Sequence, residues 1–338
     1  MPLKAGRMDK AQDGMVKMAI ITSFLGQTRD RFHEYNSPLT LEEKFHLAGQ
    51  IKGVSGVEVV YPYEVDTPQA TKALAELYGL EFAAINVNVK SDLDFRNGGP
   101  TANSKEVRDK AVRFIKEAKD FAAAAGSNKV TCCPLADGYE FSFQSDYGIA
   151  WKRLAETFGE AGDYRREIGL FIECKPSETR GTCFLSNAAK ALLLLKDIGI
   201  RQVGITLDFG HSIYGGNNPA EELALVAESG FPYYVHINDN DGKWDWDYFC
   251  GSKHFLEYAE FLWYLRKYRY AGYITSDTSP TRWDIRKTFE TNNRITRRIW
   301  ALLDELGAEG GSQLVGGDDY LATWLTIEEK LFKLKDPP

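Results

Sequence analysis

Eight short apolar runs, rich in β-branched residues and bounded by turn residues, most constrain the fold of this 338-residue chain. They are residues 18–25, 56–62, 81–89, 128–134, 168–175, 203–209, 233–238 and 272–277. Segments with helical periodicity lie between them, among them 41–51, 71–78, 105–125, 185–198, 219–229 and 255–268. Strands that alternate with helices pair in parallel, and right-handed crossovers wind such a chain in one direction. The pattern predicts an α/β fold.

Eight strands are the number that closes a (β/α)8 TIM barrel, and chains of this length form such barrels undivided. We predict a single barrel domain over residues 18–307, preceded by a flexible N-terminal segment, 1–17, and followed by a C-terminal extension, 308–338. A last barrel helix over 282–306 is expected to end at the glycine-rich stretch 307–317, and the extension to form one short amphipathic helix, 320–334. An open, doubly wound sheet has the same local pattern and is the alternative fold.

The net charge and the cysteine content narrow the range of possible functions. A formal net charge of −7 leaves no basic stripe for a phosphate backbone, which argues against a nucleic-acid partner and suits an uncharged substrate such as a sugar. No stretch approaches the roughly 20 apolar residues of a membrane span. The five cysteines are an odd number in or beside apolar segments, so we expect them to be reduced. These features predict a cytoplasmic enzyme.

Polar side chains stand at the ends of the last four predicted strands. Active sites of such barrels are built at the carboxyl ends of the strands, so these side chains should meet at one rim. The fifth strand ends on Glu173 and Lys175, the sixth on Asp208 and His211, the seventh on His236 with Asp245 and Asp247 after it, and the eighth on Asp277.

Metal binding accounts for this crowding, because converging carboxylates repel one another unless a cation neutralises them. Mixed oxygen and imidazole ligands suit Mn²⁺, Mg²⁺ or Co²⁺. Glu173 and Lys175 lie two residues apart on one strand, so both side chains face the same side, where the lysine could donate to a substrate oxygen.

Other interpretations of single residues remain open at this point. Lys175 could form a plain salt bridge with a buried carboxylate, and His211 could cap the loop after the sixth strand. Asp239 and Asp241 could supply metal ligands in place of Asp245 and Asp247.

This set of residues, in this order, resembles the site of the xylose isomerase-like barrels that isomerise or epimerise sugars, and most closely that of L-rhamnose isomerase. The resemblance implies two divalent cations per subunit. Glu173, Asp208, His236 and Asp277 would hold the first, which grips two hydroxyl oxygens of the open-chain sugar, with Asp208 as a bridge. His211, Asp245 and Asp247 would hold the second, which assists hydrogen transfer between C1 and C2, while Lys175 steadies the C1 oxygen.

The resemblance also implies the reaction and the assembly. We expect a metal-dependent aldose-ketose isomerase acting on an unphosphorylated pentose, deoxyhexose or branched sugar such as L-rhamnose or D-apiose, in a homodimer or homotetramer. His236 stands where xylose isomerase has a carboxylate, and Val59-Val60-Tyr61-Pro62 lacks that enzyme's ring-opening histidine, which argues against D-xylose.

Three alternative functions share part of this pattern. A ketose 3-epimerase shares the barrel and most ligands, but such epimerases have a glutamate where Asp277 stands and lack a lysine at the position of Lys175. A three-zinc DNA repair endonuclease is disfavoured by the acidic chain and its five histidines. The third is a barrel that binds a sugar or metal without turnover, in which metal removal would lower only the melting temperature.

Overall fold

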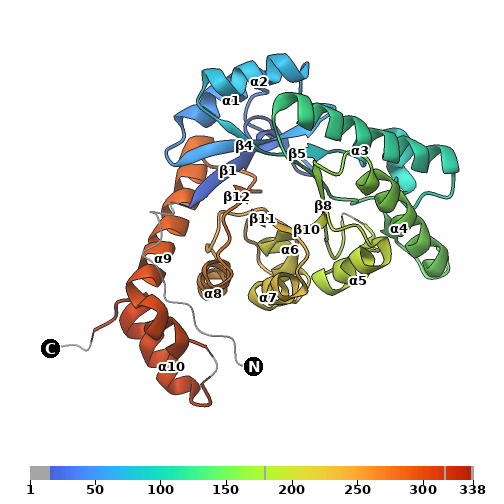
Figure 1. Ribbon diagram of the computed structural model, residues 1–338. Coiled ribbons are helices and arrows are strands. Elements are labelled where there is room, and N and C mark those ends of the chain that lie inside the picture. The colour runs from blue at the N-terminus through green and yellow to red at the C-terminus, as the bar shows by residue number, and fades with distance from the viewer. Residues whose placement is uncertain (1–15, 179, 316, 336–338) are drawn as a thin grey trace.

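The computed structural model describes residues 16–178, 180–315 and 317–335, and its ribbon is a barrel of strands surrounded by helices (Figure 1). All eight predicted strands form, and they close in the order β1-β12-β11-β10-β8-β6-β5-β4 with parallel neighbours throughout. The TIM barrel is confirmed and the open sheet is wrong. The strands are β1 (Lys17–Ile21), β4 (Val54–Tyr61), β5 (Glu81–Val87), β6 (Lys129–Cys132), β8 (Gly169–Glu173), β10 (Val203–Asp208), β11 (Tyr233–Ile237) and β12 (Tyr273–Ser276).

The helices follow the predicted segments closely, with two additions, α4 and α6. They are α1 (Leu41–Gln50), α2 (Pro68–Leu77), α3 (Lys105–Ala125), α4 (Tyr147–Asp163), α5 (Ala188–Ile198), α6 (Phe209–Tyr214), α7 (Pro219–Ser229), α8 (Phe255–Lys267), α9 (Ile285–Gln313) and α10 (Tyr320–Thr326). Neither α4 nor the short α6 was predicted from the sequence. The N-cap of α4 is Asp146, whose side chain accepts from the backbone N–H of Ile149.

The C-terminal part differs in detail from its prediction. The backbone of α9 is non-helical at Gly307 (φ 62°), where the helix was expected to end, but helical structure resumes and continues to Gln313. The predicted single helix over 320–334 is α10 followed by a π-helical turn, Ile327–Leu331. In Figure 1 this region lies at the far end of α9, away from the strands. The proposed N-terminal segment lies outside the described residues except for Val16 and Lys17, which begins β1.

Alternation along the strands divides apolar from polar side chains. In β4, Val57 and Val59 belong to the main apolar core between barrel and helices, whereas Glu58, fully buried, hydrogen-bonds residues of β5, β6 and β11 across the barrel. Two small hairpins extend the loops, β2 (Thr28–Arg29) with β3 (Glu34–Tyr35), and β7 (Gly138–Tyr139) with β9 (Thr182–Cys183). Because the barrel strands are parallel, their carboxyl ends share one rim.

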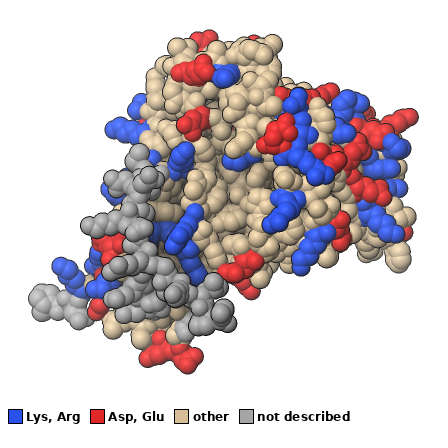
Figure 2. Space-filling model, in the orientation of Figure 1, with Lys and Arg blue, Asp and Glu red and all other residues tan. Residues whose placement is uncertain are grey.

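The charged surface over α3 and α4 is mixed in sign. On the face shown in Figure 2, Lys and Arg side chains alternate there with Asp and Glu, and the ion pairs Lys105–Asp109 and Lys116–Glu160 belong to this region. Such a surface offers no basic stripe on this face. Among the described residues, no helix is long and apolar enough to cross a membrane.

Candidate metal centre

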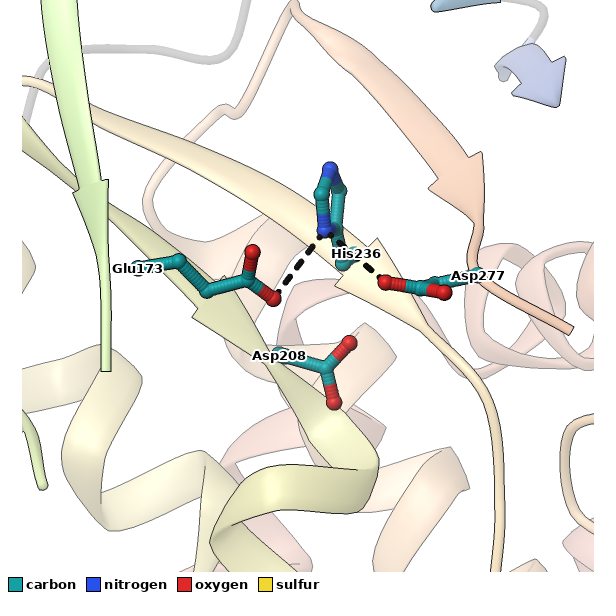
Figure 3. Close-up of side chains that lie close together, drawn as sticks. All are labelled: Glu173, Asp208, His236 and Asp277. Atoms are coloured by element: carbon teal, nitrogen blue, oxygen red, sulfur yellow. Dashed lines mark hydrogen bonds and ion pairs between the residues drawn. The ribbon is translucent and has the colours of Figure 1, made fainter. Parts of the chain in front are cut away.

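Four side chains from consecutive barrel strands converge at the rim. Glu173 ends β8, Asp208 ends β10, His236 lies in β11 and Asp277 directly follows β12. Each offers one ligand atom, and these atoms all lie within 4.8 Å of one another (Figure 3). Asp208 and His236 are register partners, so the barrel pairing itself sets two of the four ligands side by side.

His236 is the centre of this group. Its Nδ1 lies 3.2 Å from Glu173 Oε1 and 3.4 Å from Asp277 Oδ2, as the dashed lines in Figure 3 mark. The side chain has no exposed surface. Its other ring nitrogen, Nε2, lies 3.0 Å from Oε2 of Glu58, on the opposite side of the barrel interior. One ring nitrogen therefore faces the candidate metal position, and the other is occupied by a carboxylate.

Asp208 is fixed by its own helix and by an asparagine. It is the N-cap of α6, where Oδ1 accepts from the backbone N–H of His211 at 2.8 Å. Asn238 Nδ2 lies 3.1 and 3.0 Å from the two carboxylate oxygens. A Cβ at Gly210 would come within 1.5 Å of Asn238 Oδ1, so only glycine lets the first turn of α6 pass this buried amide.

A second group lies beside the first. Asp245 Oδ2 is 3.1 Å from His211 Nε2 and 2.8 Å from Lys175 Nζ, which also donates to Glu178 Oε2 at 2.7 Å. His211 Nδ1 lies 3.4 Å from Glu173 Oε1, which links the two groups. The salt bridge considered for Lys175 is therefore present, and it is formed within the cluster.

The electrostatics reflect carboxylates packed together. Burial raises the pKa of Asp208 to about 7, and Asp277 and Glu173 act in the same direction while His211 opposes them. Burial, Asp245 and Asp277 raise the pKa of Asp247 well above its usual value. Burial would raise the pKa of Glu173 as well, but His236 and His211 outweigh it and hold the pKa of that carboxyl at about 2.

The neighbouring carboxylates favour the protonated, positively charged form of both histidines. Burial lowers the pKa of an imidazole, but Asp208 and Asp245 outweigh burial and raise the pKa of His211 to about 10. Glu58 and Glu173 raise the pKa of His236 well above its usual range. In the protein alone, protons therefore partly neutralise the carboxylates, and a divalent cation would displace them.

The residues present fit such a cation. Asp245 Oδ1 is buried and has no hydrogen-bond partner among the described residues, which is costly for a carboxylate oxygen unless a cation meets it. The donor set combines carboxylate oxygens with imidazole nitrogens and includes no thiolate. Such ligands accept Mg²⁺, Mn²⁺ or Co²⁺.

The alternative ligands considered for the second group are placed elsewhere. Asp239 accepts from His254 Nδ1 at 2.8 Å and from the backbone N–H groups of Lys253, His254 and Asn240. Asp241 is exposed and accepts from Trp246 Nε1. Both carboxylates have partners away from His211, so Asp245 and Asp247 remain the candidates.

Two residues that touch the candidate ligands were missed by the sequence analysis. Asn238 holds Asp208, and Glu58 contacts His236. Burial would raise the pKa of Glu58, but His236, Thr131 and Asn86 outweigh it and keep it below its usual value. A signal for Glu58 was available, because a glutamate between two valines in an apolar strand needs partners inside the barrel.

Comparison with known proteins agrees with the fold. A structure described as a D-tagatose 3-epimerase-like protein has a TM-score of 0.67 and 22% identity, over 87% of this chain and all of that one. An L-ribulose 3-epimerase has a TM-score of 0.64 and 17% identity, over 96% of this chain and all of that one. A family 2 AP endonuclease from Brucella melitensis has a TM-score of 0.64 and 18% identity, over 81% and 97%.

Proteins of such different described activities share this architecture, so the structural likeness establishes the fold alone. The family model described as the xylose isomerase-like TIM barrel matches residues 45–298, most of the chain and nearly all of the barrel. The chain therefore belongs to the xylose isomerase-like TIM barrel family.

Proposed function

We propose that this protein is a divalent-metal-dependent aldose-ketose isomerase that acts on an unphosphorylated sugar. The observation that carries the proposal is the second group, in which Asp245 Oδ2 meets both Lys175 Nζ and His211 Nε2 beside the four-residue cluster. One cation at the four-residue cluster would leave Asp245 Oδ1 buried without a described partner, and a second cation would supply that partner.

The candidate ligands divide into two sets. Glu173, Asp208, His236 and Asp277 would hold one cation, and His211, Asp245 and Asp247 a second, with Asp208 shared between them. When bound, these cations supply Lewis-acid stabilisation of the alkoxide charge that develops on the sugar oxygens, worth several kcal/mol. The sugar is open-chain and contributes two of its hydroxyl oxygens.

Lys175 has the chemistry to bind the oxygen on C1. Its ammonium group is nearly buried, and Asp245 and Glu178 outweigh burial and raise its pKa well above the usual value, so it is a hydrogen-bond donor at neutral pH. In the proposed reaction a hydrogen moves between C2 and C1 while a proton moves between the two oxygens, so no external oxidant is required. Asp245 Oδ2 contacts both His211 Nε2 and Lys175 Nζ, and in the proposed reaction it would relay that proton.

The test is an aldose panel assayed for ketose formation by chelator-stripped protein, with Mn²⁺, Mg²⁺ or Co²⁺ added back. We expect one sugar to be turned over only with the cation. Lys175→Met should reduce kcat by about 10²- to 10⁴-fold, in the range of a lost acid-base or positioning group, while Mn²⁺ still binds. Deuterium at C2 of the aldose should be transferred to C1 or lost, and deuterium at C3 retained.

Lys119→Met is the matched control, because Lys119 is also a buried lysine but donates to the backbone carbonyls of Ala161, Gly162 and Tyr164, on the outer side of the barrel. It should lower the melting temperature and leave kcat per folded molecule unchanged. Equal turnover by the Lys175 variant and the wild type would refute the assignment of Lys175.

A second candidate is a ketose 3-epimerase, which is favoured by similar structures whose descriptions name that activity, among them the two reported above. Removal of hydrogen at C3 from one face and its return to the other requires two acid-base groups on opposite faces of the sugar. Loss of deuterium from C3 of a ketose, with deuterium at C1 retained, would replace the isomerase with this reaction.

A further inference from the structure

Glu58 is a carboxylate that the proposed reaction does not use. It has no exposed surface and lies in the interior of the barrel, on β4, across from the rim that carries the candidate ligands. Its two oxygens have different partners. Oε1 accepts from Asn86 Nδ2 at 2.9 Å and from Thr131 Oγ1 at 2.6 Å, and Oε2 lies 3.0 Å from His236 Nε2.

This arrangement dictates which nitrogen of His236 carries a proton. An ionised carboxylate only accepts hydrogen bonds, so Nε2 must be the N–H that donates to Glu58. The lone pair for a metal must then come from Nδ1, which is the atom facing Glu173 and Asp277. A histidine that binds a metal through one nitrogen is commonly oriented by a partner on the other.

We infer that Glu58 is a positioning residue for the metal centre, which fixes the proton of His236 on Nε2 and so presents Nδ1 to the cation. The inference rests on the first ligand set of the proposed function and on no feature of the second. Asn86 and Thr131 hold the carboxylate in turn, so the orientation extends over three strands, β4, β5 and β6.

Glu58→Gln tests this with almost no change in volume. The donors Asn86 and Thr131 would retain the glutamine oxygen, which leaves the NH₂ group facing His236 Nε2. Nε2 would then have to accept, and the proton would move to Nδ1, where it blocks metal binding. The variant should therefore fold and yet bind cation poorly.

The measurement is Mn²⁺ titration of chelator-stripped protein by calorimetry, together with melting of the metal-free protein. Glu58→Gln should weaken Mn²⁺ binding at the tighter of the two sites by about 10- to 100-fold, as the loss of a hydrogen-bond partner of a metal-binding histidine does. The melting temperature of the metal-free variant should stay close to that of the metal-free wild type. In ¹⁵N-histidine-labelled protein loaded with diamagnetic Mg²⁺, the wild type should show an exchange-protected N–H at Nε2 of His236, and the variant should lose it.

Asp137→Asn is the matched control. Asp137 is another buried carboxylate with three protein donors, Gly99 N–H and the N–H and hydroxyl of Thr101, but it contacts none of the candidate ligands. Its variant should change stability and leave Mn²⁺ affinity within about twofold of the wild type. If Glu58→Gln does not fold, Glu58→Asp retains the charge at a longer distance from Nε2 and should give a smaller loss.

The outcomes separate this inference from the proposed function. Mn²⁺ affinity unchanged in a folded Glu58→Gln or Glu58→Asp variant, or equally weakened in the Asp137 control, overturns the positioning role while leaving the metal site intact. Failure of the wild type to bind any divalent cation overturns the metal site first, and with it the inference.

Discussion

Two groups of buried carboxylates on the two sides of the barrel have different partners. On β4 and after β6, Glu58 and Asp137 each accept from three protein donors. In the candidate site, on and after β8 to β12, carboxylates face one another instead, and Asp245 Oδ1 has no described partner. Glu58 and Asp137 are satisfied within the protein, as Asp239 after β11 is, whereas the candidate ligands leave charge to be met from outside.

The difference shows how a symmetric fold acquires a one-sided site. All eight strands end at the same rim, and the candidate ligands come from four neighbours while the preceding strands supply support such as Glu58, Asn86 and Thr131. Unsatisfied polar groups are costly, so they persist where a ligand completes them. A buried carboxylate that faces other carboxylates therefore marks the ligand set, whereas one held by donors alone, such as Glu58, Asp137 or Asp239, lies outside it.

The largest expected effect comes from a carboxylate on the unsatisfied side. Asp208→Asn should abolish binding of at least one Mn²⁺ and reduce metal-dependent turnover by about 10³-fold or more, because a shared anionic ligand is lost. Calorimetric stoichiometry and kcat measure this. The comparison between the halves breaks if Asp137→Asn, on the satisfied side, has an equal effect on metal binding.

A smaller effect, in stability, is expected for Asp137 itself. Burial raises its pKa from 3.8 to about 6 despite its three donors. A raised pKa means that the folded state retains the proton to higher pH than the unfolded state does. The stabilisation of the wild type by protonated Asp137 is therefore complete below pH 3.8 and is lost as the pH rises through 6. Asp137→Asn does not titrate, so from pH 4 to pH 7 its unfolding free energy should rise relative to that of the wild type by up to about 3 kcal/mol.

Urea unfolding of both proteins at several pH values measures this difference, with metal removed from each sample so that the second half of the barrel contributes equally. A constant difference across this range would mean that the three donors fully compensate the burial of Asp137, and it would sharpen the contrast with the metal ligands.

The smallest expected effect tests whether the hydrogen bond from Thr131 to Glu58 influences metal binding at His236. Thr131→Val removes one donor from Glu58 Oε1 and leaves Asn86 in place. One such hydrogen bond contributes about 1 kcal/mol, so Mn²⁺ affinity should weaken by roughly fivefold at most. Calorimetry checks it. A loss as large as that of Glu58→Gln would make Thr131 part of the ligand machinery and blur the division between the halves.

Much of this molecule could be predicted from its sequence because strand and helix periodicity are strong local signals. Apolar runs located all eight strands, and helical periodicity located helices such as α1 and α3, whose N-caps in the structure are Thr40 and Ser104. The omission of α4 has a local cause, since glycines and aromatic residues interrupt its helical pattern and its exposed first turn carries Tyr147 and Ile149.

The candidate site was less accessible to prediction. Residues at strand ends could be grouped because parallel strands share a rim, but contacts across the barrel depend on closure and register, which local periodicity does not encode. Glu58 and His236 are separated by 178 positions and meet only inside the closed barrel. Asn238 was predicted to be the last residue of the seventh strand, and its contact with Asp208 becomes evident only when the first turn of α6 is placed against it.

The glycine beside Asn238 has a consequence for the evolution and engineering of this chain. A side chain at Gly210 would displace the buried amide that holds Asp208, so a library randomised at this codon should return glycine almost alone among functional clones. In the proposed isomerase, substrate preference would therefore diverge through the loops around the mouth, while the Asp-Phe-Gly-His tetrapeptide would stay unchanged. Attempts to redesign specificity should leave this turn untouched.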